Sequence, residues 1–332
     1  MSFKIYVGID VSKLCLDVFI REKQVHKQFK NDSKGFALLI QWMGKQVQEP
    51  IKSILFCFEH TGLYSLPLAL FFEEKQIHYS MIPALEIKRS LGVTRGKNDF
   101  IDSKRIAEFA YRFKDKVSVT KLPAEAITKV HSLLTLRDRL SRSLGSYVCS
   151  KNEFARALGN EYLPELLSSY DKMILAIKAE IKQLEKSIKA IINENTELRT
   201  SLELVTSVKG IGFIIASYLI VYTHNFTRFD NWRKFACYSG IAPFDYQSGT
   251  SVRGKTQVSS IANMQVKRLL HLGAICAIHT DIELRDYYQR RLSEGKTRMT
   301  VINVIRNKLI ARIFAVVKRG TPFVDIKKYI AQ

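Results

Sequence analysis

The stretch KIYVGIDVSKLCLDVFI, from Lys4 to Ile20, decides the fold of the first part of the chain. It reads as two strands rich in Val, Ile and Phe, joined through a polar turn near Ser12 and Lys13. Asp10 ends the first strand. Because an unpaired carboxylate in a buried strand costs several kcal/mol, Asp10 is the first residue to suggest a function.

Helical and strand patterns alternate beyond this stretch. A helical pattern, GFALLIQWMGKQV, precedes the apolar run SILFCFEHTG, whose length and flanks predict a buried strand that ends at Glu59. A helix through LYSLPLALFFEEK and a short strand, IHYSMIP, follow. The alternation up to about Phe113 predicts an α/β domain with a largely central sheet.

The composition points to a polyanionic partner. The 332 residues are 46% hydrophobic, enough for two domains with a core each. Lys and Arg total 52 against 31 Asp and Glu, with a net charge of +21, so nucleic acid is the leading partner. An anionic membrane surface is the competing partner, but no apolar run approaches the roughly 20 residues of a membrane span.

The N-terminus and the cysteines indicate a cytoplasmic protein. The start, MSFKIYVGID, lacks the features of a secretory signal. The cysteines are isolated, without CxxC spacing, and we expect them to be reduced: Cys15, Cys57, Cys149, Cys237 and Cys276.

After Leu122 and Pro123 the pattern becomes helical. Apolar residues with spacings of 3 and 4 predict a coiled-coil seam: Ile174, Ile177, Ile181, Leu184, Ile188 and Ile191. The partner helix is either the preceding one, from about Ile127 to Ala157, or a helix of another protomer. We therefore predict three parts: residues 1–122, a helical assembly segment at 123–200, and a mainly helical third domain at 201–332.

The third domain has two notable segments. SVKGIGFIIASYL resembles a helix-hairpin-helix turn, in which amides at a helix start can hold a phosphate, although a plain helix-helix turn also explains Gly210 and Gly212. Further on, YSGIAPFDYQSGTSVRGKT predicts a long unstructured loop, of a length that is usually functional or disordered. A basic helix, TRMTVINVIRNKLIARIFAVVKR, closes the domain.

Four carboxylates suit metal-dependent chemistry on nucleic acid. In-line attack on a phosphodiester is served by two divalent cations about 3.5 to 4 Å apart, held by several Asp or Glu, and Mg²⁺ prefers such oxygen ligands. Asp10 and Glu59 end strands, where α/β sheets place their ligands. Asp99 and Asp102 begin a helix and share one of its faces.

Each acid also has a structural explanation. Asp99 as an N-cap, with Asp102 in the first turn, would stabilise the helix dipole. Glu59 could open a helix, and Asp10 could form an Asx-turn within a hairpin.

The ordered series of motifs resembles the DEDD transposases of the insertion sequence 110 family, which includes Piv-type DNA invertases and bridge-RNA-guided recombinases. The motifs are VGIDVSK, EHTG, KNDFIDSKRIA and a C-terminal GIGFIIA…FACYSGIAPFDYQSGTSVRGK. The resemblance implies a RuvC-like, ribonuclease H-fold domain, a coiled-coil segment and a transposase domain with a nucleophilic serine. Matched by motif, the catalytic residues are Asp10, Glu59, Asp99, Asp102 and Ser248.

The resemblance also implies cofactors and partners. The four acids would hold Mg²⁺, with Mn²⁺ as a substitute, and Ser248 would link covalently to a DNA phosphate. The partners would be donor and target DNA and a guide RNA, in a bacterial, nucleoid-associated setting. Homodimers that pair into a tetramer are expected on a separate ground: exchange between two duplexes needs more than one set of cuts, and the isoleucine seam offers an interface. The chain departs from the family at SSIAN, where Ser260 and Ala262 replace the Lys and Gly that many members have.

Residue chemistry makes Ser248 plausible without making it unique. A serine hydroxyl needs activation, and no histidine is near it in sequence. Ser251, Ser259 and Ser260 are rivals. Basic residues and glycines predicted to contact the nucleic acid, some of which could neutralise charge on the phosphorane, are Lys97, Lys209, Gly210, Gly212, Arg253, Lys255, Lys267 and Arg268.

Two other functions are compatible with the sequence. One is a hydrolytic, RuvC-like junction nuclease, in which water replaces the serine as nucleophile. The other is a non-catalytic nucleic-acid-binding assembly protein, whose binding would depend steeply on salt.

Overall fold

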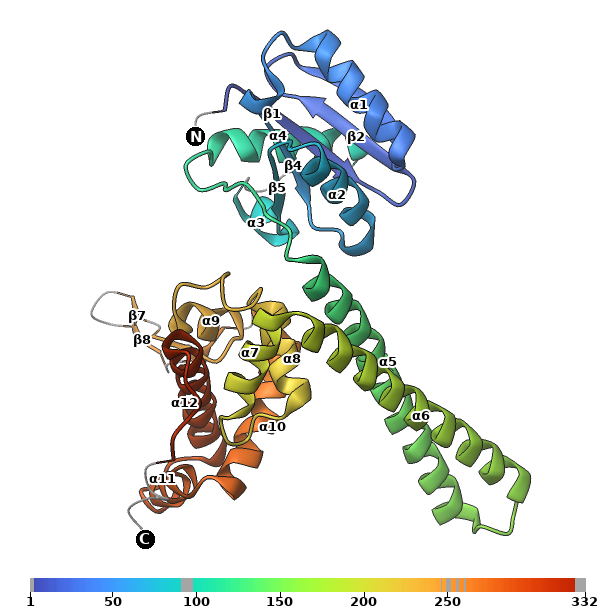
Figure 1. Ribbon diagram of the computed structural model, residues 1–332, viewed down its shortest axis with the longest axis vertical. Helices are drawn as coiled ribbons and strands as arrows, with labels where there is room; N and C mark the ends of the chain where they lie inside the picture. The colour runs from blue at the N-terminus through green and yellow to red at the C-terminus, as the bar shows by residue number, and fades with distance from the viewer. Residues whose placement is uncertain are drawn as a thin grey trace. The chain divides into compact units, whose positions relative to one another are not determined.

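The computed structural model describes residues 3–90, 98–245, 247–248, 252–254, 257–259 and 261–325, with residues 247, 248, 252 and 253 described by their backbone alone. The chain folds as two compact units, Met1–Leu122 and Pro123–Gln332 (Figure 1). The first unit is α/β and the second is mainly helical.

Unit 1 contains a five-stranded sheet with the order β3-β2-β1-β4-β5. The strands are β1 (Ile5–Val11), β2 (Cys15–Ile20), β3 (Val25–Lys30), β4 (Ile54–Glu59) and β5 (Tyr79–Ile82). β2 is antiparallel to β1 and β3, whereas β4 and β5 run parallel to β1. The four strands expected from the sequence are confirmed, and β3 is an additional strand that the sequence analysis did not predict.

Helices cover both faces of this sheet. Side chains of β1 alternate between the faces, as a pleated strand requires. Ile5, Val7 and Ile9 share one core with α1 (Ser33–Gln46) and α2 (Leu66–Glu74). Tyr6 shares the opposite core with α3 (Ala84–Ser90) and α4 (Asp99–Arg112). Short 3-10 turns, Ile51–Ser53 and Gly62–Tyr64, flank β4.

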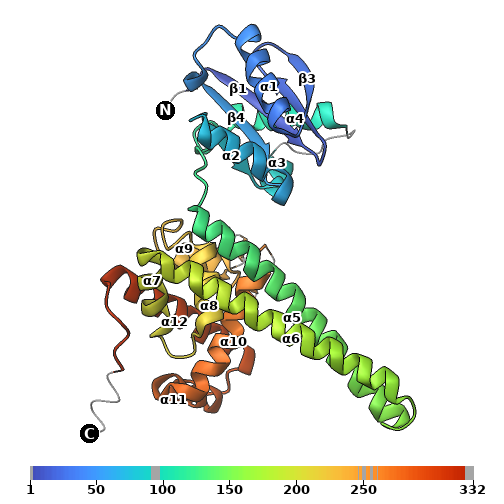
Figure 2. The same cartoon turned by 45° about the vertical axis from the view of Figure 1, so that its right-hand side comes forward.

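Unit 2 begins with an antiparallel helical hairpin made of α5 (Glu125–Leu158) and α6 (Pro164–Glu194), which lie side by side in both views (Figures 1 and 2). The predicted seam faces α5: four of its residues are buried and two half-buried. Ion pairs cross the hairpin, with 2.7 Å between Arg137 and Glu185 and 2.6 Å between Lys151 and Asp171. Of the two partners considered for the seam, the structure shows the helix of the same chain.

The rest of unit 2 is a helical body. Its helices are α7 (Thr196–Thr206), α8 (Phe213–Tyr222), α9 (Trp232–Tyr238), α10 (Met264–Thr280), α11 (Ile282–Ser293) and α12 (Arg298–Arg319). One apolar core joins this body to the near ends of α5 and α6. Among the described residues, no helix combines the length and the apolar composition that crossing a membrane requires.

The segment between α9 and α10 differs from the prediction of an unstructured loop. It contains two short antiparallel ladders, β6 (Pro243–Phe244) with β9 (Gln257–Val258) and β7 (Gln247–Ser248) with β8 (Val252–Arg253). The prediction was wrong because glycine and serine at turns conceal strands of only two residues. We call residues 239–263 the serine loop.

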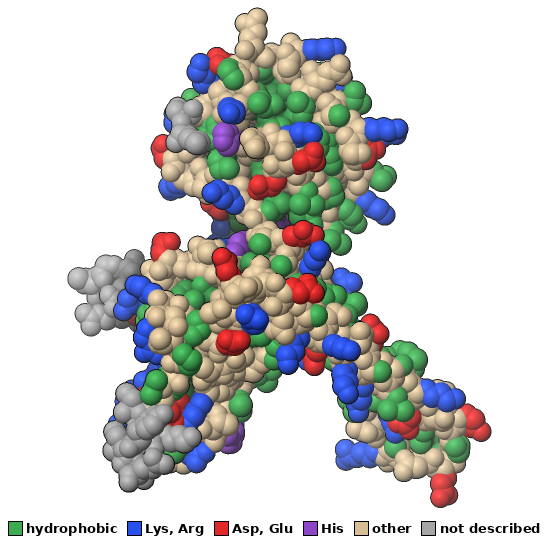
Figure 3. Space-filling view, viewed as in Figure 1, with side chains coloured by type: hydrophobic (Ala, Val, Ile, Leu, Met, Phe, Trp, Pro, Cys, Tyr) green, Lys and Arg blue, Asp and Glu red, His purple; other side chains and the backbone are tan. Residues whose placement is uncertain are grey.

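The charged side chains are spread widely. Figure 3 shows lysine and arginine side chains over the visible face of both units, interspersed with aspartate and glutamate. All five cysteines are free, as expected.

Candidate active site

A close contact between β1 and α4 builds the candidate site. A Cβ atom on Gly8 would lie 2.1 Å from the carbonyl oxygen of Ser103 and 2.4 Å from the backbone nitrogen of Ala107. Only glycine permits this approach of the helix to the strand. Gly8 therefore fixes α4 directly on the face of the sheet to which Asp10 also belongs, because residues two apart on a strand share a face.

The direction of α4 brings its first turn over Asp10. At the far end, the rings of Tyr6 and Tyr111 are in contact, with centroids 5.6 Å apart. The strand from Tyr6 to Asp10 and the helix from Asp102 to Tyr111 each span about 13 Å. The helix thus runs antiparallel to the strand, and its two aspartates reach the end of β1 that carries Asp10.

The sheet register supplies the other carboxylates. β1 and β4 are parallel, with Ile9 beside Phe58, so the next residues along the strands, Asp10 and Glu59, are neighbours on one face. Asp17 on β2 is directly opposite Asp10. Residues from three strands and one helix therefore converge.

The pKa of the Asp10 carboxyl reflects this convergence of acidic side chains. Burial raises the pKa of Asp10 and nearby acids raise it further, to about 6; in order of decreasing effect these acids are Asp102, Asp99, Glu59 and Asp17. Each of these negative charges disfavours ionisation of the Asp10 carboxyl. The other three acids predicted from the sequence, Asp102, Asp99 and Glu59, are therefore all close enough to Asp10 to act on its carboxyl.

The capping and turn explanations for these acids do not hold, although Asp99 and Asp102 do lie in the first turn of α4, where the helix dipole favours them. Asn98, and not Asp99, caps α4, because its Oδ1 accepts a hydrogen bond of 2.7 Å from the backbone nitrogen of Ile101. Glu59 is the last residue of β4 and does not open a helix. The turn after β1 is closed by Ser12, whose Oγ accepts from the backbone nitrogen of Cys15 at 3.0 Å.

The donor set suits a divalent cation in its chemistry. Mg²⁺ favours carboxylate oxygens, and a cation would relieve the repulsion that raises the pKa of Asp10. Within the ranges that the structure describes, however, no three acid, histidine or cysteine side chains are close enough to share one metal ion. Asp102 is held by Arg105 at 2.9 Å, so a cation would have to compete with this arginine.

Asp17 and its partners were missed by the sequence analysis. Asp17 is buried, and it accepts hydrogen bonds from Gln28 at 3.0 Å and from the His26 ring nitrogen Nε2 at 2.9 Å, if that nitrogen carries the proton. Both partners belong to β3, the strand that was not predicted. The signal was an acid inside the apolar strand CLDVFI, which is as unusual as Asp10 itself.

The serine loop of unit 2 is anchored at both ends. At its start, Asn303 and Asn307 of α12 donate to the carbonyl oxygen of Ile241 at 2.9 and 3.1 Å. At its end, the backbone nitrogen of Asn263 donates to the carbonyl oxygen of Tyr238 at 2.9 Å. The loop borders a cavity of about 770 Å³, whose lining includes Phe244 of β6 and Gln257 and Val258 of β9.

Ser248 belongs to this loop by its backbone. It lies on β7, opposite Val252 of β8. Among its rivals, Ser259 accepts a hydrogen bond from the backbone nitrogen of Ile261 at 3.1 Å. Ser251 and Ser260 lie outside the described residues.

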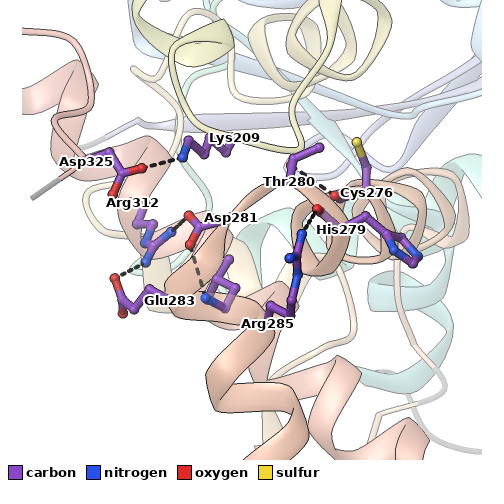
Figure 4. Close-up of polar contacts among 10 residues, drawn as sticks. Lys209, Cys276, His279, Thr280, Asp281, Glu283, Arg285, Arg312 and Asp325 are labelled. Carbon is purple, nitrogen blue, oxygen red and sulfur yellow. Dashed lines mark hydrogen bonds and ion pairs between the residues drawn. The ribbon is translucent and has the colours of Figure 1, made fainter. Parts of the chain in front are cut away.

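Two of the three predicted nucleic-acid contacts at the helix-hairpin-helix-like turn, Lys209 and Gly210, make contacts within the protein. Lys209 forms an ion pair with Asp325 (Figure 4). Gly210 has a φ of +88°, and a Cβ atom there would lie 2.5 Å from the carbonyl oxygen of Gly273, so its absent side chain lets the turn pack against α10. Gly212 is exposed at the N-cap of α8.

The remaining predicted basic contacts are distributed over the chain. Lys267 is half-buried on α10, and Arg268 is paired with Asp138 of α5. Burial would raise the pKa of Asp138, but hydrogen bonds from Arg268 and Gln265 outweigh this effect and lower it. Arg253 is described by its backbone, on β8; two further predicted contacts lie outside the described residues, namely Lys97 and Lys255.

Comparison with known proteins gives consistent matches along the chain. A model of DEDD transposases of the IS110 type matches residues 7–158, and a model described as the transposase IS116/IS110/IS902 family matches residues 202–289. The pilin gene-inverting protein of Moraxella lacunata is 26% identical over 328 residues, which cover 96% of this chain and 98% of that protein.

Proteins from insertion elements match shorter regions. The IS110 uncharacterized 43.6 kDa protein of Streptomyces coelicolor is 30% identical over 159 residues, 48% of this chain and 37% of that protein. The IS900 uncharacterized 42 kDa protein of Mycobacterium paratuberculosis is 23% identical over 189 residues, 55% of this chain and 46% of that protein.

These matches, together with the neighbouring acids of unit 1, identify the chain as an enzyme that cuts and joins DNA. The chain belongs to the IS110 family of transposases. Membership of the DEDD group implies the use of a divalent metal.

Proposed function

We propose that this transposase breaks and rejoins DNA by transesterification, with Asp10, Glu59, Asp99 and Asp102 forming the metal site and Ser248 acting as the nucleophile. The observation that carries the proposal is that the other three acids, Asp102, Asp99 and Glu59, all raise the pKa of the Asp10 carboxyl. Carboxylates that destabilise one another persist where a cation is to be bound.

The proposed fold of unit 1 is that of ribonuclease H. Its support is the strand order β3-β2-β1-β4-β5, with β1 to β3 antiparallel and β4 and β5 parallel to β1. The four acids would hold Mg²⁺ or Mn²⁺, which when bound stabilises charge on the attacking and leaving oxygens of a phosphodiester. Release of Asp102 from Arg105 would free an oxygen for this role.

The proposed covalent step uses the serine loop. The Ser248 oxygen forms a bond to phosphorus while the bond from phosphorus to a deoxyribose oxygen breaks, and the serine proton ends on the released hydroxyl. Attack of a deoxyribose hydroxyl on the serine phosphodiester reverses the step and rejoins DNA. The anchoring of the loop at Ile241 by two asparagines would hold the serine for this reaction.

The partners follow from the family and the charge. A net charge of +21 suits donor and target DNA together with a guide RNA, and a helix-hairpin-helix-like turn at Gly210 and Gly212 would contact the backbone. Exchange between two duplexes needs more than one set of cuts, for which homodimers paired into a tetramer would serve, with the protein at the nucleoid. The full-length match to a pilin gene-inverting protein supports DNA inversion as a second outcome of the same chemistry.

The experiment that tests the acidic site compares DNA cleavage by wild type, Glu59→Gln and Glu49→Gln. Glu49 is an acid of the same unit that pairs with Lys4 at 3.0 Å, so its variant controls for the loss of one negative charge. The reaction contains donor and target DNA, RNA transcribed from the flanking region, and Mg²⁺ or a chelator. We expect Mg²⁺-dependent cleavage that Glu59→Gln abolishes and Glu49→Gln retains; equal activity of the two variants would reject the proposal.

A further inference from the structure

An arginine in the core of unit 2 has no acid to balance it among the residues that the structure describes. Arg306 of α12 is only 6% exposed. Its Nη2 contacts Nδ1 of His271 at 2.5 Å and its Nη1 donates weakly to Asn303 at 3.5 Å, while its buried Nε has no hydrogen-bond partner in the described part of the chain. Burial lowers the pKa of Arg306, and among the described residues no charge is near enough to oppose this effect.

Another arginine of α12, Arg312, has the acidic partners that a buried guanidinium usually has. Arg312 donates to Asp281 and to Glu283, both at 2.7 Å (Figure 4). A buried guanidinium without such partners destabilises the folded state, and replacing buried charges by apolar residues is often stabilising. Arg306 therefore carries a buried positive charge that no acid of the described residues offsets.

The contact with Arg306 determines which ring nitrogen of His271, a half-buried residue of α10, carries the proton. A guanidinium can only donate hydrogen bonds, so Nδ1 of His271 accepts and Nε2 of the neutral ring carries the proton. Burial lowers the pKa of His271, and the charges of Arg306 and Arg298 lower it further, which keeps the ring neutral. The half-buried ring thus presents an N–H donor, and Lys267 lies one helical turn before it.

The cluster lies at the root of the serine loop. Asn303, which accepts from Arg306, also donates to the carbonyl oxygen of Ile241 at 2.9 Å. The side chains named here are donors or cations: Lys267, His271, Arg298 and Arg306. Such a set matches the acceptor oxygens and the negative charge of a phosphate.

We propose that this cluster binds one phosphate of the nucleic-acid backbone beside the serine loop. His271 and Lys267 contact the phosphate, and Arg306 is a positioning residue that sets the His271 tautomer and adds its charge from behind. The inference rests on the proposed function, because DNA or its RNA partner supplies the phosphate. It adds a binding site in unit 2 that is separate from the four acids of unit 1.

The test uses the full chain, a short DNA duplex and three variants. Arg306→Met removes the buried charge, His271→Ala removes the donor, and Lys318→Met removes an exposed charge from the same helix as a control. Affinity is measured over a salt series, and thermal unfolding is measured without DNA. We expect Arg306→Met and His271→Ala to bind about tenfold more weakly, with a salt slope reduced by about one for Arg306→Met, and Lys318→Met to change affinity less than about threefold.

Thermal unfolding separates binding from structural support. Arg306→Met should unfold at the same temperature as wild type or higher, since the fold loses an unpaired charge. A lower midpoint for this variant, or affinity of His271→Ala equal to that of Lys318→Met, would overturn the proposal. Failure of wild type to bind the duplex at all would instead contradict the proposed function.

Discussion

Replacing Asp10 by asparagine should stabilise the metal-free protein while abolishing its activity. The pKa of Asp10 is raised from 3.8 to about 6 in the folded state, so its ionisation lowers the free energy of unfolding progressively between these two pH values and by the full amount above pH 6. The full shift corresponds to about 3 kcal/mol, and solvent screening of a partly exposed carboxyl reduces this to about 1–2 kcal/mol. Asparagine has the same shape and cannot ionise.

The assay is thermal unfolding in a chelator at two pH values. Near pH 7.5 we expect Asp10→Asn to unfold about 3–5 °C above wild type. Near pH 5 the wild-type carboxyl is mostly protonated in the folded state, so the advantage should fall to about half. An Asp10→Asn variant that is destabilised near pH 7.5, or whose advantage does not depend on pH, would refute the mutual repulsion of the acids.

Three further substitutions test the packing within the two units. Gly8→Ala should destabilise unit 1 by about 2–3 kcal/mol in chemical unfolding and abolish cleavage, since its Cβ would meet the Ser103 carbonyl at 2.1 Å; near-wild-type stability would contradict the close contact. Asp281→Ala should lower the free energy of unfolding of unit 2 by about 3 kcal/mol, because it leaves Arg312 with one partner and α11 without its cap. Unfolding measurements can check this value against Asp281→Asn. Asn307→Ala should lower the rate of DNA joining with little change in affinity, because it loosens the serine loop; unchanged joining kinetics would show that the anchor is dispensable.

Four strands of unit 1 could be predicted because each is marked by a pattern in its own short stretch of sequence. β1, β2, β4 and β5 are apolar runs bounded by polar turns, and the four acids stand at ends of such runs or at a helix start. β3 escaped prediction because VHKQFK lies at the edge of the sheet, with only Phe29 buried, so its composition is that of a surface segment. Because β3 was not predicted, the partners of Asp17 on this strand were not predicted either.

Other features depend on contacts between distant residues. Nothing local distinguishes Asn98 as the cap of α4 from the neighbouring Asp99, because both residue types serve as N-caps. All charged residues of α12 are basic, so the sequence does not distinguish Arg306 from the others. Only the packing of α12 against α10 shows that this arginine is buried. The two ladders of the serine loop pair residues too few in number to leave a periodic signal.

The most direct measurement of the central claim is a search for a covalent DNA-protein adduct. Wild type, Ser248→Ala and Asp10→Ala would be incubated with Mg²⁺, labelled donor and target DNA and the flanking RNA, then examined before and after protease treatment. The account predicts a protease-sensitive adduct with wild type and none with either variant. Cleaved, unattached DNA from Ser248→Ala would contradict it, because water would then be the nucleophile and the acids alone would carry the reaction.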